Sequence, residues 1–347
     1  MRILITGGAG FIGANLVRHW VEAHPDDEVV VLDALTYAGH RTSIRDLEES
    51  RKIEFIHGDI RVPADVRRAV EGADVIAHLA AESHVDRSIA DPAPFFSTNV
   101  LGTYTLLEAS RTVADGVRFH HVSTDEVFGS LPLDDPSRRF TEATPYAPRS
   151  PYAASKAASD HLVRSYFHTY GLPATVSNCG NNYGPFQDPE KLIPLAIARL
   201  LQGGRVPLYG SGTNVRDWIH VSDHCRALDA IVRHGRAGAT YLVGADGEMS
   251  NSEVVERLVH LLGRERSAIE HVADRPGHDA RYAIDSRATR TALRWTPTVG
   301  FEEGLASTVR WYQEHRGWWE PILAERRGNG AHSGPMLSGR GQRTENS

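Results

Sequence analysis

Short apolar segments alternate with longer segments of helical period through the first half of this chain, and this alternation constrains its fold most strongly. The expected strands are RILIT, EVVVLD, IEFIHGD, DVIAHLA, FHHVST and ATVSNC. The expected helices cover residues 11–23, 62–71 and 152–170, where apolar positions follow a helical period. Strands that alternate with helices form a mainly parallel sheet covered on both faces. We therefore predict an α/β fold with a doubly wound, Rossmann-like sheet.

The alternation stops beyond Asn181, where segments rich in Pro and Gly such as NNYGPFQDPEKLIP follow. A chain of 347 residues suits two connected domains, at roughly 150 residues each. We expect a Rossmann-like domain over residues 1–180 with a return segment at 217–243. A smaller mixed α/β lobe would comprise 181–216 and 244–325. Residues 326–347 have little apolar content and are expected to form a disordered tail.

The composition excludes several classes of protein. No apolar run approaches the roughly 18 residues that a membrane span needs, and the net charge of -6 does not favour nucleic acid as a partner. Two cysteines, Cys179 and Cys225, are too few for a disulfide framework or a four-cysteine zinc site, so we expect packing residues and no metal. The amino terminus reads as a strand instead of a signal peptide, which makes a cytoplasmic location the default.

The segment ITGGAGFIG places Gly7, Gly10 and Gly13 between the first strand and the first helix. Glycines allow a sharp turn there and let a dinucleotide diphosphate approach the helix amino terminus. Asp33 ends the second strand, where a carboxylate accepts hydrogen bonds from ribose hydroxyls and repels a 2'-phosphate, so NAD is favoured over NADP. The alternative is a purely structural glycine turn with Asp33 as a solvated strand end.

The segment SPYAASK places Tyr152 and Lys156 one helical turn apart on the same face. An ammonium near a phenol favours the phenolate, which would lower the pKa of Tyr152 from about 10 toward the range of a useful base. A surface pair with no function is the alternative. The position of this pair after a nucleotide-binding half favours the catalytic interpretation.

The segment HVSTDEVFG places Asp125 and Glu126 side by side at the end of a buried strand. Two neighbouring carboxyl groups in a cleft of low dielectric repel each other, which separates their pKa values and allows one acid and one base. A helix cap is the alternative interpretation of an acidic pair at this place.

Eight stretches together resemble the dTDP-glucose 4,6-dehydratase family, whose members are extended short-chain dehydrogenases/reductases. The stretches span nearly all of residues 1–315 and are TGGAGFIG, DALTYAG, HLAAESHVDRSI, HVSTDEVFG, SPYAASKAASDHLV, NCGNNYGPFQDPEKLIP, RDWIHVSDHCRAL and DRPGHDARYAID. The glycines and Tyr-x-x-x-Lys mark only the superfamily, whereas Thr124-Asp125-Glu126 and DRPGH are more specific. The resemblance implies NAD-dependent dehydration of dTDP-glucose to its 4-keto-6-deoxy product.

The resemblance also implies a role for each matching residue. Tyr152 would deprotonate the glucose 4-hydroxyl, Glu126 would remove the C5 proton, and Asp125 would protonate the leaving C6 hydroxyl. Thr124 and Ser83 would bind sugar hydroxyls, and Arg216 would bind the diphosphate. The expected cofactor contacts are Gly7, Gly10, Phe11, Ile12, Gly13, Asp33, Ala34, Leu35, Thr36, Asp59, Ile60, Leu79, Ala80, Ala81, Ser83, Thr98, Ser123, Tyr152, Lys156 and Asn182. The expected substrate contacts are Ser83, Thr124, Asn181, Lys191, Leu192, Pro207, Leu208, Tyr209, Arg216, Asn251, Asp274, Arg275, Pro276, Gly277 and His278.

Several alternatives stay open from the sequence. A nucleotide-sugar 4-epimerase, a dehydratase of UDP- or CDP-sugars, and a dinucleotide-binding scaffold share parts of these motifs. The acid pair disfavours the epimerase, and the dyad together with the acid pair disfavours the scaffold. Residues 131–149 form a shorter segment than the family leads us to expect, which we interpret as a trimmed surface loop. The resemblance implies a homodimer packed through the helices around residues 97–111 and 152–169.

Overall fold

The computed structural model describes residues 1–114 and 116–328. Its main feature is a seven-stranded sheet with the strand order β10-β6-β5-β4-β1-β2-β3, in which every neighbouring pair is parallel. The strands are β1 (Arg2–Thr6), β2 (Glu28–Asp33), β3 (Glu54–His57), β4 (Val75–His78), β5 (Arg118–Thr124), β6 (Ala174–Cys179) and β10 (Thr240–Val243). The predicted doubly wound α/β fold is confirmed.

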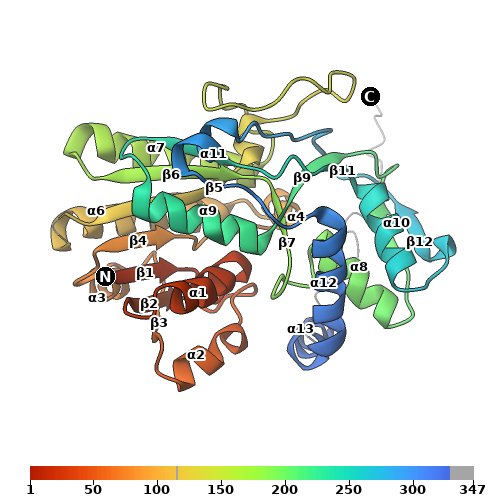
Figure 1. Ribbon diagram of the computed structural model, residues 1–347, viewed down its shortest axis with the longest axis horizontal. Helices are drawn as coiled ribbons and strands as arrows, with labels where there is room; N and C mark the ends of the chain where they lie inside the picture. The colour runs from red at the N-terminus through yellow and green to blue at the C-terminus, as the bar shows by residue number, and fades with distance from the viewer. Residues whose placement is uncertain (115, 329–347) are drawn as a thin grey trace, which may run out of the picture.

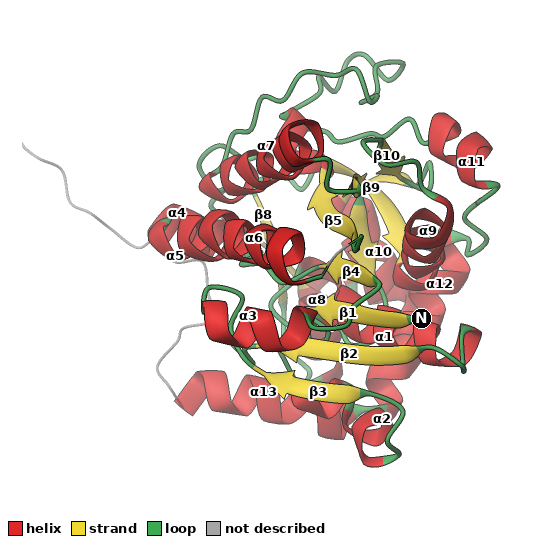
Figure 2. Ribbon diagram, turned by 90° about the vertical axis from the view of Figure 1, so that its left-hand side faces the viewer, coloured by secondary structure: helices red, strands yellow, loops and turns green. Residues whose placement is uncertain are grey.

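Helices cover both faces of this sheet (Figure 2). One apolar core packs Leu4, Ile76 and Phe119 beneath α3, α6 and α7, whereas the other packs Ile3 and Ile5 beneath α1 and α9. Successive strand residues point to opposite faces, so both cores arise from the same strands. The helices of this part are α1 (Phe11–Ala23), α2 (Arg45–Glu49), α3 (Pro63–Val70), α4 (Val85–Ala90), α5 (Ala93–Phe95), α6 (Thr103–Val113), α7 (Pro151–Tyr170) and α9 (Val221–His234). A π-helical segment, η2 (Phe96–Gly102), precedes α6, and a short 3-10 helix, η1 (Arg41–Ser43), precedes α2.

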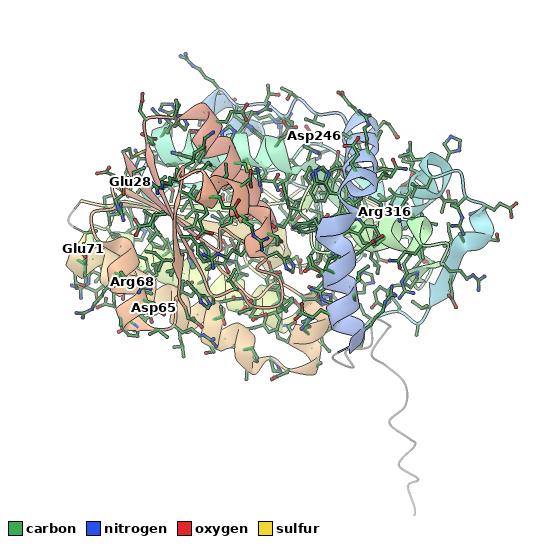
Figure 3. The ribbon with its side chains drawn as sticks, turned by 90° about the horizontal axis from the view of Figure 1, so that it is seen from below. Glu28, Asp65, Arg68, Glu71, Asp246 and Arg316 are labelled. Carbon is green, nitrogen blue, oxygen red and sulfur yellow. The ribbon has the colours of Figure 1, made fainter. Side chains whose placement is uncertain are left out.

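Ion pairs on the outer surface add little to this fold. Figure 3 shows Asp65 and Arg68 one turn apart on α3, and their charged atoms lie 3.8 Å from each other. An exposed pair of this kind contributes about 0–1 kcal/mol, so the two apolar cores account for most of the stability.

The second part of the chain forms a smaller lobe beside the sheet (Figure 1). It contains a three-stranded sheet of order β11-β9-β7 and a two-stranded sheet of β12 and β8. Its strands are β7 (Asn181–Tyr183), β8 (Val206–Tyr209), β9 (Val215–His220), β11 (Glu248–Ser250) and β12 (Ile269–Val272). Its helices are α8 (Leu192–Leu201), α10 (Asn251–Leu261), η4 (Arg266–Ala268), α12 (Phe301–Glu314) and α13 (Arg316–Gly328). Helix α11 (Arg287–Leu293) returns to the first part, where it packs against α9 and β10.

The chain crosses back to the first part after β9. Helix α9 packs against α1, and β10 pairs with β6 in the large sheet. Strand β9 itself pairs with β7 and β11 in the small sheet. The division into domains at 1–180, 181–216, 217–243 and 244–325 stays a prediction.

The expected disordered tail begins too early at residue 326. Helix α13 continues to Gly328, and Arg326 forms an ion pair with the buried Asp188 at 2.6 Å. Low apolar content wrongly predicted disorder at residue 326, because an ion pair with Asp188 fixes Arg326 in place of apolar packing. Residues 329–347 lie outside the described residues. Within the described ranges, none of the helices combines the length and the apolar character needed to cross a membrane.

Candidate active site

A cleft of about 310 Å³ opens where the carboxyl ends of the large sheet meet residues 180–191 of the second lobe. This is the edge at which doubly wound folds bind ligands. The cleft is lined by all five predicted catalytic residues and by every predicted cofactor residue except Leu35. Of the predicted substrate residues it includes Ser83, Thr124, Asn181 and Lys191.

The glycine turn leaves the amino terminus of α1 open toward this cleft. Gly7 has a φ of +73°, and a Cβ there would lie 2.6 Å from the backbone nitrogen of Ala80. A Cβ at Gly13 would lie 2.0 Å from the carbonyl oxygen of Gly7, so neither position tolerates a side chain. The first turn of α1 has no side-chain cap and no acidic residue. Its free amide groups therefore fit the diphosphate of a dinucleotide.

Asp33 is held rigidly beside the glycine turn. One carboxylate oxygen accepts a hydrogen bond from the Ala9 amide at 2.9 Å and the other from the Leu35 amide at 2.8 Å. Burial raises the pKa of Asp33, although these two amides and nearby histidines oppose the shift. Each oxygen keeps a lone pair for a ribose hydroxyl. Leu35 thus acts through its backbone, which explains its absence from the lining.

The acid pair lies in η3 (Asp125–Phe128), directly after β5. Thr124, and neither acid, caps this turn, because its Oγ1 accepts a hydrogen bond from the Glu126 amide at 3.2 Å. Asp125 is only 2% exposed. Its Oδ2 has no hydrogen-bond partner among the described residues. An unpaired buried carboxyl oxygen is costly unless the group serves a function.

Different neighbours separate the two carboxyl groups. Burial raises the pKa of Asp125 well above its usual range, and the charges of Glu126 and Asp217 raise it further. Burial also raises the pKa of Glu126, but the cations Arg216 and Lys191 oppose this shift. At neutral pH this arrangement favours Asp125 as the protonated acid and Glu126 as the carboxylate base.

Tyr152 and Lys156 both line the cleft. The prediction that Lys156 lowers the pKa of the Tyr152 phenol was wrong for the protein alone. Burial raises the pKa of Tyr152 well above its usual range, and the charges of Glu126 and Asp125 add to the shift. Lys156 donates a hydrogen bond to the Val122 carbonyl at 2.8 Å and is itself buried, which lowers its pKa to about 8. Burial, with the charge of Glu126 added to it, therefore determines the direction of this shift, an effect that four-residue spacing does not reveal.

The remaining predicted substrate residues lie outside the lining of the cleft, in the second lobe. Arg275 stacks on the Tyr209 ring, with 4.8 Å between its guanidinium and the ring centroid, and both residues contact Asp86. Arg216 lies 4.3 Å from the Tyr282 ring centroid and donates to the Asp279 carbonyl at 3.1 Å. The others are Leu192, Pro207, Leu208, Asn251, Asp274, Pro276, Gly277 and His278. Leu208 packs in the core of this lobe, so only its backbone is available to a ligand.

Sequence reasoning missed several residues that line the cleft. They are Leu32, Ala38, Gly39, Gly58, Arg61, Glu82, Val122, Cys179, Gly180, Gln187, Asp188 and Glu190. Cys179 was expected to be a packing residue, but it borders the cleft, where burial raises the pKa of its thiol to about 12. Gln187, Asp188 and Glu190 belong to the irregular segment after Asn181. No local sequence pattern predicts that this segment lies near the glycine turn.

Comparisons with known proteins agree with this geometry. Residues 4–308 match the family model described as GDP-mannose 4,6 dehydratase. The dTDP-glucose 4,6-dehydratase of Mycobacterium tuberculosis (strain CDC 1551 / Oshkosh) is 52% identical over 323 residues, which cover 93% of this chain and 96% of the relative. The dTDP-glucose 4,6-dehydratase 1 of Escherichia coli (strain K12) is 50% identical over 345 residues, with 93% and 95% covered. A crystal structure of DesIV, the dTDP-glucose 4,6-dehydratase of Streptomyces venezuelae, with NAD and TYD bound, superposes with a TM-score of 0.89 at 51% identity and covers 93% of this chain and 100% of that one.

Proposed function

This chain belongs to the dTDP-glucose 4,6-dehydratase family, and from that premise we propose that it dehydrates dTDP-glucose to dTDP-4-keto-6-deoxyglucose with NAD as a retained cofactor. NAD, when bound, supplies the oxidising power for C4 and returns the same reducing equivalents to C6. The residues that would hold it are the amide groups of the first turn of α1 and the carboxylate of Asp33.

One observation carries the proposal: two adjacent carboxyl groups in the cleft, Asp125 buried and Glu126 half-buried, with neighbours that favour opposite protonation states. A reaction that only moves hydrogen at C4, such as 4-epimerisation, needs one acid–base group. Removal of a hydroxyl from C6 needs a base for the C5 proton and an acid for the leaving oxygen. Asp125 and Glu126 meet this need together.

Each residue then has a defined role. Tyr152 takes the proton of the C4 hydroxyl, and Thr124 stabilises the charge on that oxygen as the ketone forms. The ketone acidifies the C5 hydrogen, which Glu126 removes. Asp125 donates its proton to the C6 hydroxyl, so that water leaves. Glu126 then returns a proton to C5 as C6 is reduced.

The nucleotide would lie across the second lobe. Arg216 and Arg275 carry planar guanidinium groups, which suit the oxygens of a diphosphate, and Lys191 adds a third cation. Their charges act on Glu126, so a bound diphosphate would partly neutralise them and make Glu126 a stronger base. We include thymine as the base in the proposal because the relatives carry dTDP in their names.

Incubation with dTDP-glucose tests the proposal directly. Loss of one water from the nucleotide sugar, without net reduction of the cofactor, is the expected result by mass spectrometry. Unchanged mass with inverted C4 would support a 4-epimerase, and no turnover would support a dinucleotide-binding scaffold. Competition among dTDP-, UDP- and CDP-glucose would then establish the preferred base.

Arg326 is expected to control how firmly NAD is held. It donates to the two oxygens of Asp188 at 2.7 and 2.6 Å and to the Tyr37 carbonyl at 3.0 Å. Asp188 lines the cleft, and Tyr37 lies between the lining residues Thr36 and Ala38, in the segment 34–39 that we call the cofactor loop. Loss of one partner of a buried ion pair is costly, at about 3–5 kcal/mol. We predict that Arg326→Ala releases NAD at least about tenfold faster, a change of 1.4 kcal/mol.

The NAD content that remains after dialysis measures this effect without any activity assay. Arg327→Ala is the matched control, because Arg327 is exposed and contacts Gln202 instead of the cofactor loop. Equal retention of NAD in both variants would contradict the role of Arg326.

The same proposal includes a homodimer and a cytoplasmic location. Phe96, Leu101 and Tyr104 lie near the start of α6 and are 44%, 60% and 48% exposed, which is unusual for neighbouring large apolar side chains. They lie in the region through which the homodimer is expected to pack. Leu101→Glu should convert a dimer into a monomer in light scattering. A monomeric wild type would contradict this part of the proposal.

A further inference from the structure

Three polar side chains lie along one face of α7. The first two line the cleft and the third is buried beyond it. Tyr152, Lys156 and Asp160 are spaced by four residues, so each lies one turn from the next. Asp160 is 0% exposed and lies outside the lining of the cleft. The reaction steps proposed above use Tyr152 but give no reason for a fully buried carboxyl group further along the same face.

One ring nitrogen of His121, on β5, contacts both Lys156 and Asp160. This nitrogen, Nε2, is 3.4 Å from the Lys156 Nζ and 3.2 Å from the Asp160 Oδ1. Burial lowers the pKa of His121 to about 4, and the charge of Lys156 lowers it too, so the ring is neutral at neutral pH. A neutral ring adds no charge of its own, so the ammonium of Lys156 and the carboxylate of Asp160, which meet at this nitrogen, attract each other.

Asp160 is held as a carboxylate from its other side. Its Oδ2 accepts hydrogen bonds from the Tyr146 hydroxyl at 2.7 Å and from the Asn178 amide at 3.2 Å. Burial alone would raise the pKa of Asp160, but the contact with His121, the charge of Lys156 and the hydrogen bond from Tyr146 lower it overall. The Tyr146 hydroxyl in turn accepts from Arg164 at 2.7 Å. These contacts fix the carboxylate in one position.

The other titratable groups that face Lys156 are uncharged. His78 on β4 is neutral because burial lowers its pKa well below the usual range. Cys179 on β6 is a thiol because burial raises its pKa to about 12. Burial lowers the pKa of Lys156 to about 8, and Asp160 opposes that shift. Within the described part of the chain, Asp160 is therefore the anion on which the charge of Lys156 depends most.

We propose that Asp160 is a positioning residue whose carboxylate, which meets Lys156 at the neutral His121 ring, keeps Lys156 an ammonium ion beside the reacting groups. This role in the reaction rests on the proposed function, because Tyr152 must lose a proton while burial and the charge of Glu126 disfavour the phenolate. A lysine that lost its charge would no longer offset that effect. Asp160 thus keeps the dyad active at neutral pH.

The composition of the chain makes a direct test practical, since it contains three lysines, Lys52, Lys156 and Lys191. Labelling lysine with 13C at Cε gives three NMR signals, and the Lys156 signal is the one that Lys156→Arg removes. In the wild type this signal should titrate near pH 8. In Asp160→Asn its midpoint should fall by about 1–3 pH units, the range expected for loss of a nearby opposite charge. An unmoved midpoint would overturn the proposal.

Two further variants separate charge from structure. Tyr146→Phe removes a hydrogen bond to Asp160 but keeps the carboxylate, so the Lys156 midpoint should stay in place. Lys156→Met leaves Asp160 without its cation, and addition of Asp160→Asn should raise the melting temperature above that of Lys156→Met alone. A double variant that melts at or below Lys156→Met would also overturn the proposal, even if Asp160→Asn alone did not fold.

The titration is measured without substrate. Absence of wild-type turnover would therefore contradict the proposed function alone, whereas an unmoved Lys156 midpoint would contradict the role of Asp160 alone. With an active wild type, the falling alkaline limb of kcat should move to lower pH in Asp160→Asn, because Lys156 then loses its proton at lower pH.

Discussion

Tyr152→Phe is expected to lower kcat by about 10²–10⁴ and to leave the KM for dTDP-glucose nearly unchanged. The variant keeps the ring but loses the oxygen that takes the C4 hydroxyl proton. It should fail at the first step, so neither reduced cofactor nor dehydrated sugar accumulates. Stopped-flow absorbance of the cofactor with product mass spectrometry measures both.

The matched control is Tyr170→Phe, which removes an exposed hydroxyl from the same helix. Its kcat should equal that of the wild type. A Tyr152→Phe variant that still oxidised the sugar at the wild-type rate would transfer the role of base to another group, and the assignment of Tyr152 would be wrong.

Asp125→Asn with Glu126→Gln is expected to separate oxidation from elimination. The double variant keeps Tyr152, so C4 oxidation should continue and part of the cofactor should remain reduced. Formation of the dehydrated product should fall by about 10²–10⁴, because the C5 base and the acid for the leaving hydroxyl are both lost. Single-turnover analysis of cofactor absorbance and sugar mass distinguishes this block from that in Tyr152→Phe.

Asp134→Asn with Glu142→Gln is the control for this double variant, because both residues are exposed in the segment that follows the acid pair. It makes the same two replacements of an acid by its amide and should retain full activity. If the acid-pair variant lost oxidation and elimination equally, the two carboxyl groups would serve to build the site and would have no specific role in the second half of the reaction.

Local patterns predicted the main part of the fold. The alternation of strands and helices specified the parallel sheet, and residues 11–23 form α1 within the bounds that their period indicates. The end of the chain was less predictable, because Arg326 depends on an ion pair with Asp188, a distant residue in sequence. A composition-based rule evaluates only neighbours along the chain, so it cannot detect such a contact.

In the candidate site, too, local features could be predicted from the sequence and features that depend on distant contacts could not. The glycine turn, Asp33, the acid pair and the dyad are adjacent or regularly spaced in sequence, and the structure brings them to one cleft. The pKa of Tyr152 was predicted in the wrong direction, because burial and the charges of Asp125 and Glu126 depend on tertiary packing. Asp160 continues the four-residue spacing of Tyr152 and Lys156, so the sequence held a signal for it. Its importance becomes visible only when β5 brings one ring nitrogen of His121 into contact with both Lys156 and Asp160.

Conversion of dTDP-glucose that carries deuterium at C4 is the most direct test of the central claim, which is that oxidation at C4 enables the acid pair to expel the C6 hydroxyl. The account predicts a product that has lost one water and carries the deuterium in its C6 methyl group. In Asp125→Asn/Glu126→Gln the deuterium should leave C4 without reaching C6. Dehydrated product from this variant at the wild-type rate, or a wild-type product with deuterium still at C4, would contradict the account.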